Sequence, residues 1–352
     1  MQLANSCGAQ YRHLIVSMDG QAMASERLSS GVNWRLMPIE NRRGGALANR
    51  EAFRRALGEW RPDLLLTYNW GAIEWAAGNL PMRVPHVHVE DGFGPGEAQR
   101  QLPRRVWGRR GILGLGHAQV VVPSRRLAQH AKAWWVPRKR LHYIPNGVPT
   151  AAATQARPAV PAGRPIVIGT LAGMRAEKNL SRLLRAFAVA SRDHDLRLLI
   201  VGDGPDRPAL QALAQELGIS DRTEFTGYLR QPHQRLREMD LFALSSDTEQ
   251  QPMSMLEAMA QGIPVIATSV GDVPFIAPPE AAAAMLCAPE DEAFTQTLGS
   301  VLQRRSEWPA WAEAGLARVR SHFAYDDMIQ RWRLVFDGRA AEVPQLPMGE
   351  LA

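Results

Sequence analysis

The feature that most constrains the fold is an alternation of short apolar runs with longer segments of helical period. In the first half, the apolar runs are His13–Met18, Leu64–Tyr68, His86–Val89, Gln119–Val122 and Leu141–Ile144. In the second half, runs at Ile166–Leu171, Leu196–Val201, Glu224–Thr226, Leu241–Ser245 and Ile263–Thr268 alternate with helical segments at Leu180–Arg192, Arg207–Leu217, around Gln234–Met239 and from Ser254. Asn49 is expected to cap a further helix before Leu64. Strands separated by helices predict an α/β fold with parallel sheets covered on both faces.

The chain is long enough for two domains, because 352 residues correspond to about two domains of roughly 150 residues each. An Ala/Pro-rich stretch, PTAAATQARPAVPAGR, interrupts the alternation at residues 149–164 and is typical of a linker. We therefore predict a first domain over residues 1–148 and a second over 165–323. A last helical segment follows at 324–338, and the tail at 339–352 is expected to be disordered.

Composition excludes several classes of protein. Hydrophobic residues make up 45% and charged residues 22% of the chain, which is ordinary for a globular protein. The only cysteines, Cys7 and Cys287, are far apart, so they predict neither a disulfide framework nor a zinc site and suit a reducing compartment. No apolar run reaches the ~20 residues that span a bilayer, and the first residues lack a signal-peptide core. We expect a cytoplasmic chain.

The net charge of +6 conceals a local excess of positive charge. No Asp or Glu occurs from Ala98 to Thr150, whereas this window contains eleven of the 41 Lys and Arg residues. They are Arg100, Arg104, Arg105, Arg109, Arg110, Arg125, Arg126, Lys132, Arg138, Lys139 and Arg140. Trp107, Trp134 and Trp135 lie among them, a mixture that suits an anionic membrane surface; a solvated basic face with core tryptophans explains it equally well. No nucleic-acid-binding motif is recognisable, so nucleic acid is not an expected partner.

Two glutamates eight positions apart, Glu249 and Glu257, raise a chemical question. Ser254 and Glu257 form an S-x-x-E pattern, which predicts a capping box and explains Glu257 without a ligand. Glu249 lies in the loop after the strand predicted at Leu241–Ser245 and has no such explanation. A carboxylate beside helix amides suits a polyol joined to a phosphate, because amides hold phosphate and carboxylates accept hydrogen bonds from hydroxyl groups.

The motif E-x7-E followed by EAMAQGIPVIAT resembles the signature of family 4 retaining glycosyltransferases, which have the GT-B fold. IPNGV, LAGMRAEKNLSRLLRAFA, VGDGP and FTGYL resemble further elements of that family in the same order, and HFAYDDMIQRWRLVF resembles its C-terminal helix that crosses back onto the first domain. The resemblance covers nearly the whole chain. It implies two Rossmann-like, doubly wound parallel-sheet domains that face a cleft.

The resemblance also implies roles for individual residues. Glu249 would contact the donor sugar of a nucleotide sugar, Lys178 would neutralise its pyrophosphate, and Glu257 would bind ribose hydroxyls. The other donor-binding positions that it implies are Gly173, Arg175, Gly202, Gly204, Gly227, Tyr228, Gln250, Gln251, Pro252, Met253 and Ser254. The family needs no metal and no cofactor besides the donor. The one D-x-D here, Asp193–Asp195, precedes a strand and is therefore interpreted as a loop and not as a metal site.

The sequence departs from the family pattern in three places. Gly173 occupies the position, five residues before Lys178, where the family has an arginine; Arg175 is a substitute, although its side chain would point elsewhere if the segment is extended. MQLANSCG resembles the end of the family's first helix, so we expect the first strand and Gly-rich loop to be missing. The family's loop histidine aligns with Asp91, and His88 is close by; roles in strand or turn structure are equally good for both.

We therefore expect a retaining, metal-independent glycosyltransferase with Glu249, Lys178, Asp91 and His88 as catalytic candidates. Its acceptor would be a hydroxyl of a cell-surface glycan or of a lipid-linked molecule. The anionic inner face of the cytoplasmic membrane is a further expected partner, through Arg100–Arg140. The alternative is a catalytically impaired relative that binds nucleotide or glycan, and the expected N-terminal loss and Gly173 favour it. The sequence does not distinguish UDP from GDP.

Overall fold

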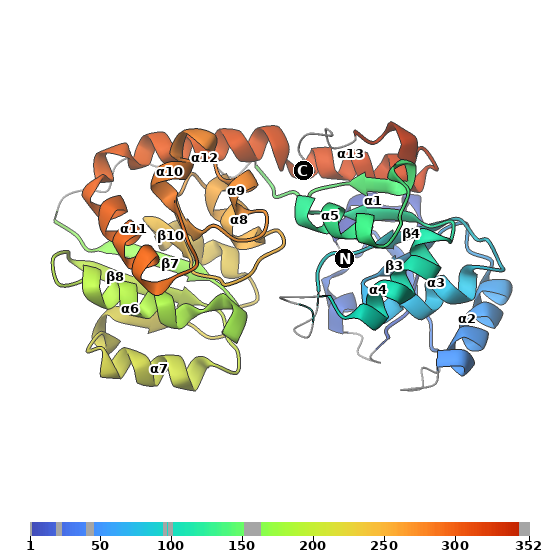
Figure 1. Cartoon of the computed structure of the whole chain (residues 1–352), viewed down its shortest axis with the longest axis horizontal. Coiled ribbons are helices and arrows are strands. Elements are labelled where there is room, and N and C mark those ends of the chain that lie inside the picture. Colours follow the sequence, from blue (N-terminus) through green and yellow to red (C-terminus); the bar gives the residue numbers. More distant parts are fainter. Residues whose placement is uncertain are drawn as a thin grey trace. The chain divides into compact units, whose positions relative to one another are not determined.

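The computed structural model describes residues 2–18, 23–39, 46–93, 97, 101–150 and 163–344. The chain divides into two compact units (Figure 1). The first unit consists of Met1–Pro145 together with Asp327–Ala352, and the second consists of Asn146–Asp326. The predicted linker and tail fall largely on residues outside the described part of the chain.

The second unit is built on a six-stranded parallel sheet. Its strands are β7 (Ile166–Leu171), β8 (Leu196–Val201), β9 (Thr223–Phe225), β10 (Leu241–Leu244), β11 (Val265–Thr268) and β12 (Leu286–Cys287). They lie in the order β12-β11-β10-β7-β8-β9, and every pair is parallel. β7 and β10 are neighbours although two strands separate them in the sequence. At this pair the winding of the chain reverses, as in doubly wound folds.

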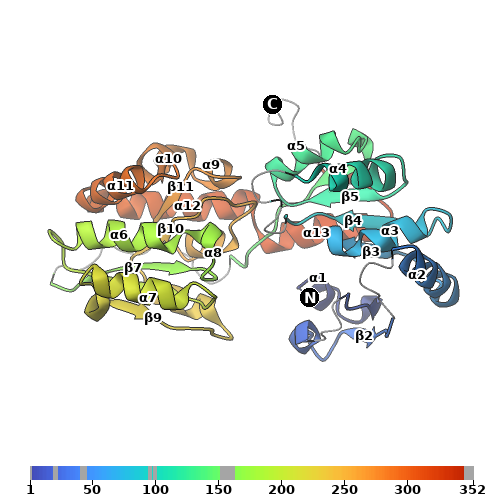
Figure 2. The ribbon, with the colours of Figure 1, turned by 60° about the horizontal axis from the view of Figure 1, so that its bottom comes forward.

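Helices lie on both sides of this sheet (Figure 2). They are α6 (Leu180–Ala190), α7 (Arg207–Glu216), α8 (Met253–Ala260), α9 (Val273–Ile276), α10 (Pro279–Met285), α11 (Asp291–Gln303) and α12 (Trp308–His322). Because both faces are covered, the central strands β10 and β11 are buried at every residue and have no alternation of apolar and polar side chains. Ile168, Leu198 and Phe242 of the strands and Phe187 of α6 are buried in one core. This unit has the doubly wound α/β class that the sequence predicts.

The first unit contains two separate parallel sheets. β3 (Leu65–Tyr68), β4 (His86–Val89), β5 (Gln119–Val122) and β6 (Leu141–Tyr143) pair in that order. β1 (Arg12–Ile15) pairs only with β2 (Asn33–Leu36) among the described strands, and the sequence did not predict β2. The helices of this unit are α1 (Gln2–Cys7), α2 (Ala46–Trp60), α3 (Ile73–Asn79), α4 (Pro103–Arg109) and α5 (Arg125–Ala133). The predicted absence of an earlier strand stays a prediction.

The last helix, α13 (Tyr325–Phe336), joins the first unit. The ring of Phe336 meets that of Tyr11 at a centroid distance of 5.7 Å, and the Tyr11 hydroxyl donates to Asp337 at 2.9 Å. More than three hundred residues lie between these partners in sequence. The prediction that the C-terminal helix crosses back to the first domain is confirmed.

Two of the predicted helix caps are wrong. Asn49 lies inside α2, and its side-chain amide donates to Glu74 at 2.9 Å instead of capping a helix. α8 begins at Met253, with Pro252 as its N-cap and no side-chain cap. Ser254 is therefore already helical, so the capping box with Glu257 cannot form. This correction leaves Glu257 without the structural explanation that the sequence offered.

Candidate functional site

The loops after β7 and β10 meet at the point where the second unit's sheet reverses its winding. Lys178 ends the short 3-10 helix Ala176–Lys178 after β7, and Glu249 lies in the loop after β10. Lys178 Nζ donates to Glu249 Oε1 at 2.6 Å, and Ser246 Oγ donates to the same oxygen at 2.7 Å. In open doubly wound sheets, ligands bind outside the carboxyl ends of the strands at this point. The ion pair therefore lies where a ligand is expected.

Close backbone contacts fix the loop that carries Glu249. Gln251 is buried, and its amide accepts from the Asn146 N–H at 2.8 Å and donates to the Asn146 carbonyl at 3.1 Å. Gly271 has a φ of +56°, and a Cβ there would come within 1.9 Å of the Glu249 carbonyl oxygen. The Asp272 N–H donates to the carbonyl of Gln250 at 3.3 Å. The Gln251 side chain is thus occupied, so only its backbone remains for a ligand.

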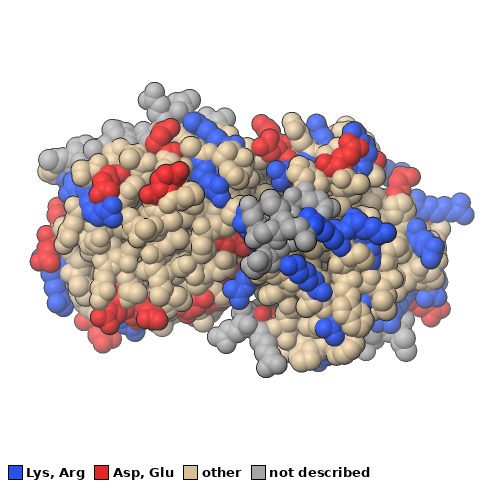
Figure 3. All heavy atoms as spheres, turned by 45° about the horizontal axis from the view of Figure 1, so that its top comes forward, with Lys and Arg blue, Asp and Glu red and all other residues tan. Residues whose placement is uncertain are grey.

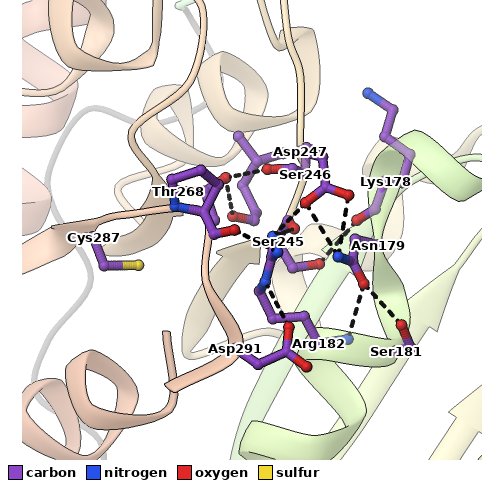
Figure 4. Close-up of polar contacts among 12 residues, drawn as sticks. Lys178, Asn179, Ser181, Arg182, Ser245, Ser246, Asp247, Thr268, Cys287 and Asp291 are labelled. Atoms are coloured by element: carbon purple, nitrogen blue, oxygen red, sulfur yellow. Dashed lines mark hydrogen bonds and ion pairs between the residues drawn. The ribbon is translucent and has the colours of Figure 1, made fainter. Parts of the chain in front are cut away.

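A buried arginine supports the end of β10 just before this loop (Figure 4). Arg182 is 4% exposed and donates to the Ser245 carbonyl at 2.8 Å, while its guanidinium lies 2.8 Å from Asp247. Asn179 adds an amide hydrogen bond to Asp247 at 3.1 Å, and the Thr268 hydroxyl donates to the Ser246 carbonyl at 2.6 Å. Because these polar groups satisfy one another, the backbone that leads to Glu249 is held from three sides.

The N-terminus of α8 is the second part of the site. No side chain caps it, so its first N–H groups lack the partner that a cap would supply, and such a helix end is suited to phosphate. Glu257 lies one turn further along. Burial raises the pKa of its carboxyl group above the ordinary value, and its side chain has no hydrogen-bond or ion-pair partner within the described ranges. It is a half-buried acceptor with free hydrogen-bonding capacity.

Glycines let the loops after β7, β8 and β9 approach one another. A Cβ at Gly202 would lie 2.1 Å from the Ala172 carbonyl oxygen, and a Cβ at Gly204 would lie 2.3 Å from that of Met174. Gly202 also forms a backbone bridge with Gly227. Tyr228 follows Gly227 and is 69% exposed. The predicted positions in these three loops are therefore brought together at the carboxyl ends of the strands.

Arg175 turns back toward Gly173. The Arg175 N–H donates to the Gly173 carbonyl at 2.9 Å, which closes a three-residue turn. A Cβ at Gly173 would lie 3.4 Å from Arg175 Nε. The side chain is 55% exposed and pairs with Glu177 at 3.1 Å. The backbone at Arg175 is extended, with φ −135° and ψ 155°, yet the guanidinium lies beside the space that Gly173 leaves open.

The two candidates of the first unit differ in exposure. His88 on β4 is completely buried, with Nδ1 2.8 Å from the Thr67 hydroxyl and Nε2 3.5 Å from Glu90. Asp91 is exposed, and its N–H donates to the side chain of Asn69 at 2.7 Å. This geometry favours the role in strand structure for His88 and leaves only Asp91 accessible to a ligand.

The D-x-D stretch, which is interpreted from the sequence as a loop, lies far along the chain from the site residues of the loop after β10. Asp193–Asp195 lies between α6 and β8, at the end of β8 opposite to Gly202. In the described ranges, no group of three or more His, Cys, Asp or Glu residues is arranged to hold a metal ion. None of the helices in the same ranges is long and apolar enough to cross a bilayer.

Comparisons with known families match both halves of the chain. Residues 2–152 match the model described as Glycosyltransferase Family 4. Residues 165–304 match the model described as Glycosyl transferases group 1. Each match covers less than half of the chain, and both are to models of glycosyltransferases. The second matched region contains Lys178, Glu249 and Glu257, so the ion pair and the free carboxylate lie within the group 1 match.

Curated glycosyltransferases share part of this chain. It is 28% identical over 271 residues to D-inositol 3-phosphate glycosyltransferase of Nocardia farcinica, which covers 69% of the chain and 59% of that protein. It is 36% identical over 104 residues to N-acetyl-alpha-D-glucosaminyl L-malate synthase of Bacillus anthracis, which covers 30% of the chain and 27% of that protein. The chain thus spans less than two thirds of the length of these two relatives.

Solved structures share the fold of this chain. The Anabaena protein Alr3699/HepE in complex with UDP superimposes with a TM-score of 0.77, covers 96% of this chain and 95% of its own, and is 16% identical. Sucrose-phosphate synthase from Thermosynechococcus elongatus has a TM-score of 0.68 over 87% of this chain and 83% of its own, at 21% identity. These likenesses show the GT-B fold that the sequence resemblance implies.

Proposed function

We propose that the chain is a retaining, metal-independent glycosyltransferase that moves a sugar from a nucleotide-diphosphate sugar to an acceptor hydroxyl. The observation that carries this proposal is the 2.6 Å pair of Lys178 and Glu249 at the switch point of the second unit. Beside it in sequence are the uncapped N-terminus of α8 and the unpartnered carboxylate of Glu257. Together they offer a cation and amides for a diphosphate and two carboxylates for hydroxyl groups.

Donor binding would exchange the partners of this site. The diphosphate draws Lys178 away from Glu249, because its two phosphates together carry two negative charges and so attract a cation more strongly than one carboxylate does. Glu249 then has an oxygen free to accept from a hydroxyl of the donor sugar, and Glu257 accepts from ribose. The Anabaena neighbour was solved with UDP, which supports a nucleotide donor.

Arg175 would add a second cation to the diphosphate site. Its guanidinium already lies beside Gly173, and its present partner Glu177 is a surface pair at 3.1 Å. Exposed pairs of this kind contribute little, typically about 0–1 kcal/mol, so Arg175 can change partners. This weakens the case for the catalytically impaired alternative, because that case rested in part on the missing arginine at position 173.

The proposed transfer takes place on one face of the sugar. The bond from the anomeric carbon to the phosphate oxygen breaks, and its electron pair stays on the diphosphate. The acceptor oxygen forms the new bond on the same face, and its proton passes to the departing phosphate. The protein's main contribution is to stabilise the charge that develops on the leaving group, through Lys178, Arg175 and the amides of α8.

The acceptor would be a hydroxyl of a cell-surface glycan or of a lipid-linked molecule. The proposal is supported by one curated relative, which is named a lipopolysaccharide core biosynthesis glycosyltransferase, LpsD, of Rhizobium meliloti and is 27% identical over 202 residues. In the first unit, Asp91 is the accessible candidate for contact with the acceptor. For a lipid-linked acceptor, we propose that the chain works at the inner face of the cytoplasmic membrane.

Calorimetric titration with UDP and with GDP tests the donor site. We expect saturable binding of one of the two and a loss of about tenfold or more, or about 1.4 kcal/mol, in each of Lys178→Ala, Glu257→Ala and Arg175→Ala. Lys139→Ala, Glu280→Ala and Arg192→Ala are matched controls in exposed positions. No binding of either nucleotide by the folded chain would refute the donor site.

Slow hydrolysis of the donor in the absence of an acceptor tests the stereochemistry. The sugar released first should keep the anomeric configuration of the donor, as read by proton NMR before mutarotation, and the rate should be unchanged by EDTA. An inverted sugar or a rate abolished by EDTA would contradict the mechanism. Nucleotide binding without any turnover, with or without candidate acceptors, would instead support the impaired alternative.

A further inference from the structure

Three large apolar side chains of the basic window are exposed. Trp107 on α4 is 61% exposed, Leu115 is 75% exposed, and Trp135 just after α5 is 50% exposed. Apolar surface is normally scattered on a protein, and a gathered apolar group indicates an interaction site. Trp107 and Trp135 are gathered, because their rings meet edge to face at a centroid distance of 5.8 Å.

Arg110 holds the two indoles together. Its guanidinium carbon lies 4.6 Å from the ring centroid of Trp107 and 4.7 Å from that of Trp135, and its Nε donates to the Ala133 carbonyl at 2.8 Å. Cation–π contacts at exposed sites contribute about 0.5–1 kcal/mol each, so they favour this arrangement. In it, the Arg110 guanidinium contacts both indole rings.

The backbone is arranged to expose Trp135. Its neighbour Trp134 is completely buried, and the Trp134 indole N–H donates to Gln101 at 2.7 Å. Trp135 has a φ of +61°, which is an unfavourable conformation for a bulky residue. A Cβ at Gly114 would lie 2.3 Å from the Trp134 carbonyl oxygen, so the approach of this segment requires glycine there. Trp134 is therefore a core residue, and Trp135 is a surface residue.

Exposed cations lie close to these apolar residues in the sequence. The window 98–150 has no Asp or Glu, and Arg104, Lys132, Arg138 and Lys139 within it are exposed. Other cations of the window are already engaged within the protein: Arg109 is buried against Glu90 and Glu97, Arg105 pairs with Glu97 at 2.7 Å, and Arg140 donates to three backbone carbonyls. On the face drawn in Figure 3, Lys and Arg are more frequent than Asp and Glu over the first unit.

We propose that Trp107, Trp135 and Leu115, with Arg110 and the exposed cations around them, form a surface that binds the anionic face of a lipid bilayer. Indole rings are favoured at the level of the lipid headgroups, where their apolar body and polar N–H are both satisfied. Arg and Lys next to them are attracted to anionic headgroups. Leu115 favours a lipid bilayer over a glycan as the partner. A glycan stacks on indole rings but gains little from an exposed leucine. The acyl region of a bilayer, in contrast, accepts a leucine side chain.

Binding to a bilayer would bring the chain to a lipid-linked acceptor, and in that respect this surface rests on the proposed function. Binding to lipid needs no nucleotide sugar, so the two proposals can fail separately. A chain that binds vesicles but not UDP or GDP would retain the surface and lose the transferase.

Vesicle flotation with the full chain tests the surface. The chain should float with vesicles of mixed phosphatidylcholine and phosphatidylglycerol, should not float with pure phosphatidylcholine, and should be released by salt. The pair Trp107→Ser with Trp135→Ser, and separately the pair Arg104→Ser with Lys139→Ser, should each lower the partition coefficient by about tenfold or more. Both pairs change exposed side chains, and thermal unfolding verifies that each variant is folded.

Matched controls remove similar side chains elsewhere. Met82→Ser with Val189→Ser removes exposed apolar groups, and Arg192→Ser with Arg305→Ser removes exposed charge; both pairs should float like the unmodified chain. Equal flotation with both kinds of vesicle, or no effect of the tryptophan pair, would overturn the proposal. Binding of an anionic heparin oligosaccharide without vesicle binding would replace it with a glycan site.

Discussion

Gly271 packs directly against the backbone of the loop that carries Glu249, with no room for a side chain. A Cβ there would lie 1.9 Å from the Glu249 carbonyl oxygen, and its φ is +56°. Gly218 in the same unit has a φ of +67° but nothing within 4 Å of its Cβ position. We predict that Gly218→Ala destabilises the chain by about 1–2 kcal/mol, the usual disadvantage of a left-handed backbone for an L-residue, and leaves nucleotide affinity unchanged.

Gly271→Ala should destabilise the chain by more than Gly218→Ala and should also weaken UDP or GDP binding, because the Glu249 loop must move to make room. Urea unfolding and calorimetry measure the two effects on the same samples. Equal losses of stability in the two variants, with full nucleotide affinity in Gly271→Ala, would show that this close approach does not position Glu249.

Some residues of the site could be predicted from the sequence and others could not. Lys178, Glu249 and Glu257 lie within recognisable motifs, so their neighbourhood follows from a short stretch of sequence. The support of the loop depends on contacts between distant positions, such as Gln251 with Asn146, 105 residues away. A residue type does not reveal such a partner. Arg182 shows the same limit, because a buried arginine resembles any exposed helical arginine in the sequence.

At the scale of elements, β3 and β4 share a buried histidine cluster. The Thr67 hydroxyl on β3 lies 2.8 Å from a ring nitrogen of His86 and 2.8 Å from one of His88 on β4. Burial, together with His88 and His117, lowers the pKa of His86 to about 3. As the pH falls below about 6.5, His86 therefore binds a proton in the unfolded chain but stays neutral in the folded chain. The associated stability is complete above pH 6.5 and is lost as the pH falls toward 3.

We predict that His86→Gln removes this part of the acid sensitivity. Between pH 6 and pH 4.5 the free energy of unfolding of the variant should fall less steeply, by at most about 1.4 kcal/mol per pH unit, which corresponds to one proton. Urea titrations at several pH values measure the slope, and His233→Gln, at an exposed position of the second unit, is the matched control. An unchanged slope in His86→Gln would mean that other groups dominate the acid response.

The elements that the sequence predicted well are those covered on both faces. β4, β5 and β7 are buried over almost their whole length, and their predicted bounds match the structure. β2 was missed because all four of its residues are exposed and carry no apolar run. The start of α8 was missed because the S-x-x-E pattern also occurs inside a helix, and only the cap geometry at Pro252 distinguishes the two cases.

At the scale of the whole molecule, each unit has buried apolar residues of its own. The second unit packs Ile168, Phe187 and Phe242 in one core, and the first packs Phe53 against Trp75 at a ring distance of 4.3 Å. The proposed donor contacts, in contrast, all belong to the second unit. A nucleotide should therefore stabilise one unit directly. We predict two unfolding transitions, of which UDP or GDP raises only the one that belongs to Asn146–Asp326.

The size of the shift follows from linkage. At a nucleotide concentration of 100 times Kd, the bound unit gains about 2.7 kcal/mol of stability. For a unit of this size, Tm rises by about 2–4 °C per kcal/mol, so the Tm of the second unit should rise by about 5–10 °C. Thermal proteolysis with mass spectrometry assigns each transition, because peptides from α6 and from α3 report on different units. With an affinity at least about tenfold weaker, Lys178→Ala should gain at most about 1.4 kcal/mol at the same nucleotide concentration, so its shift should fall to half or less, while the first unit's transition stays where it was. A single transition that rises as a whole would instead show that the two cores unfold together, and the donor site would then stabilise the entire chain.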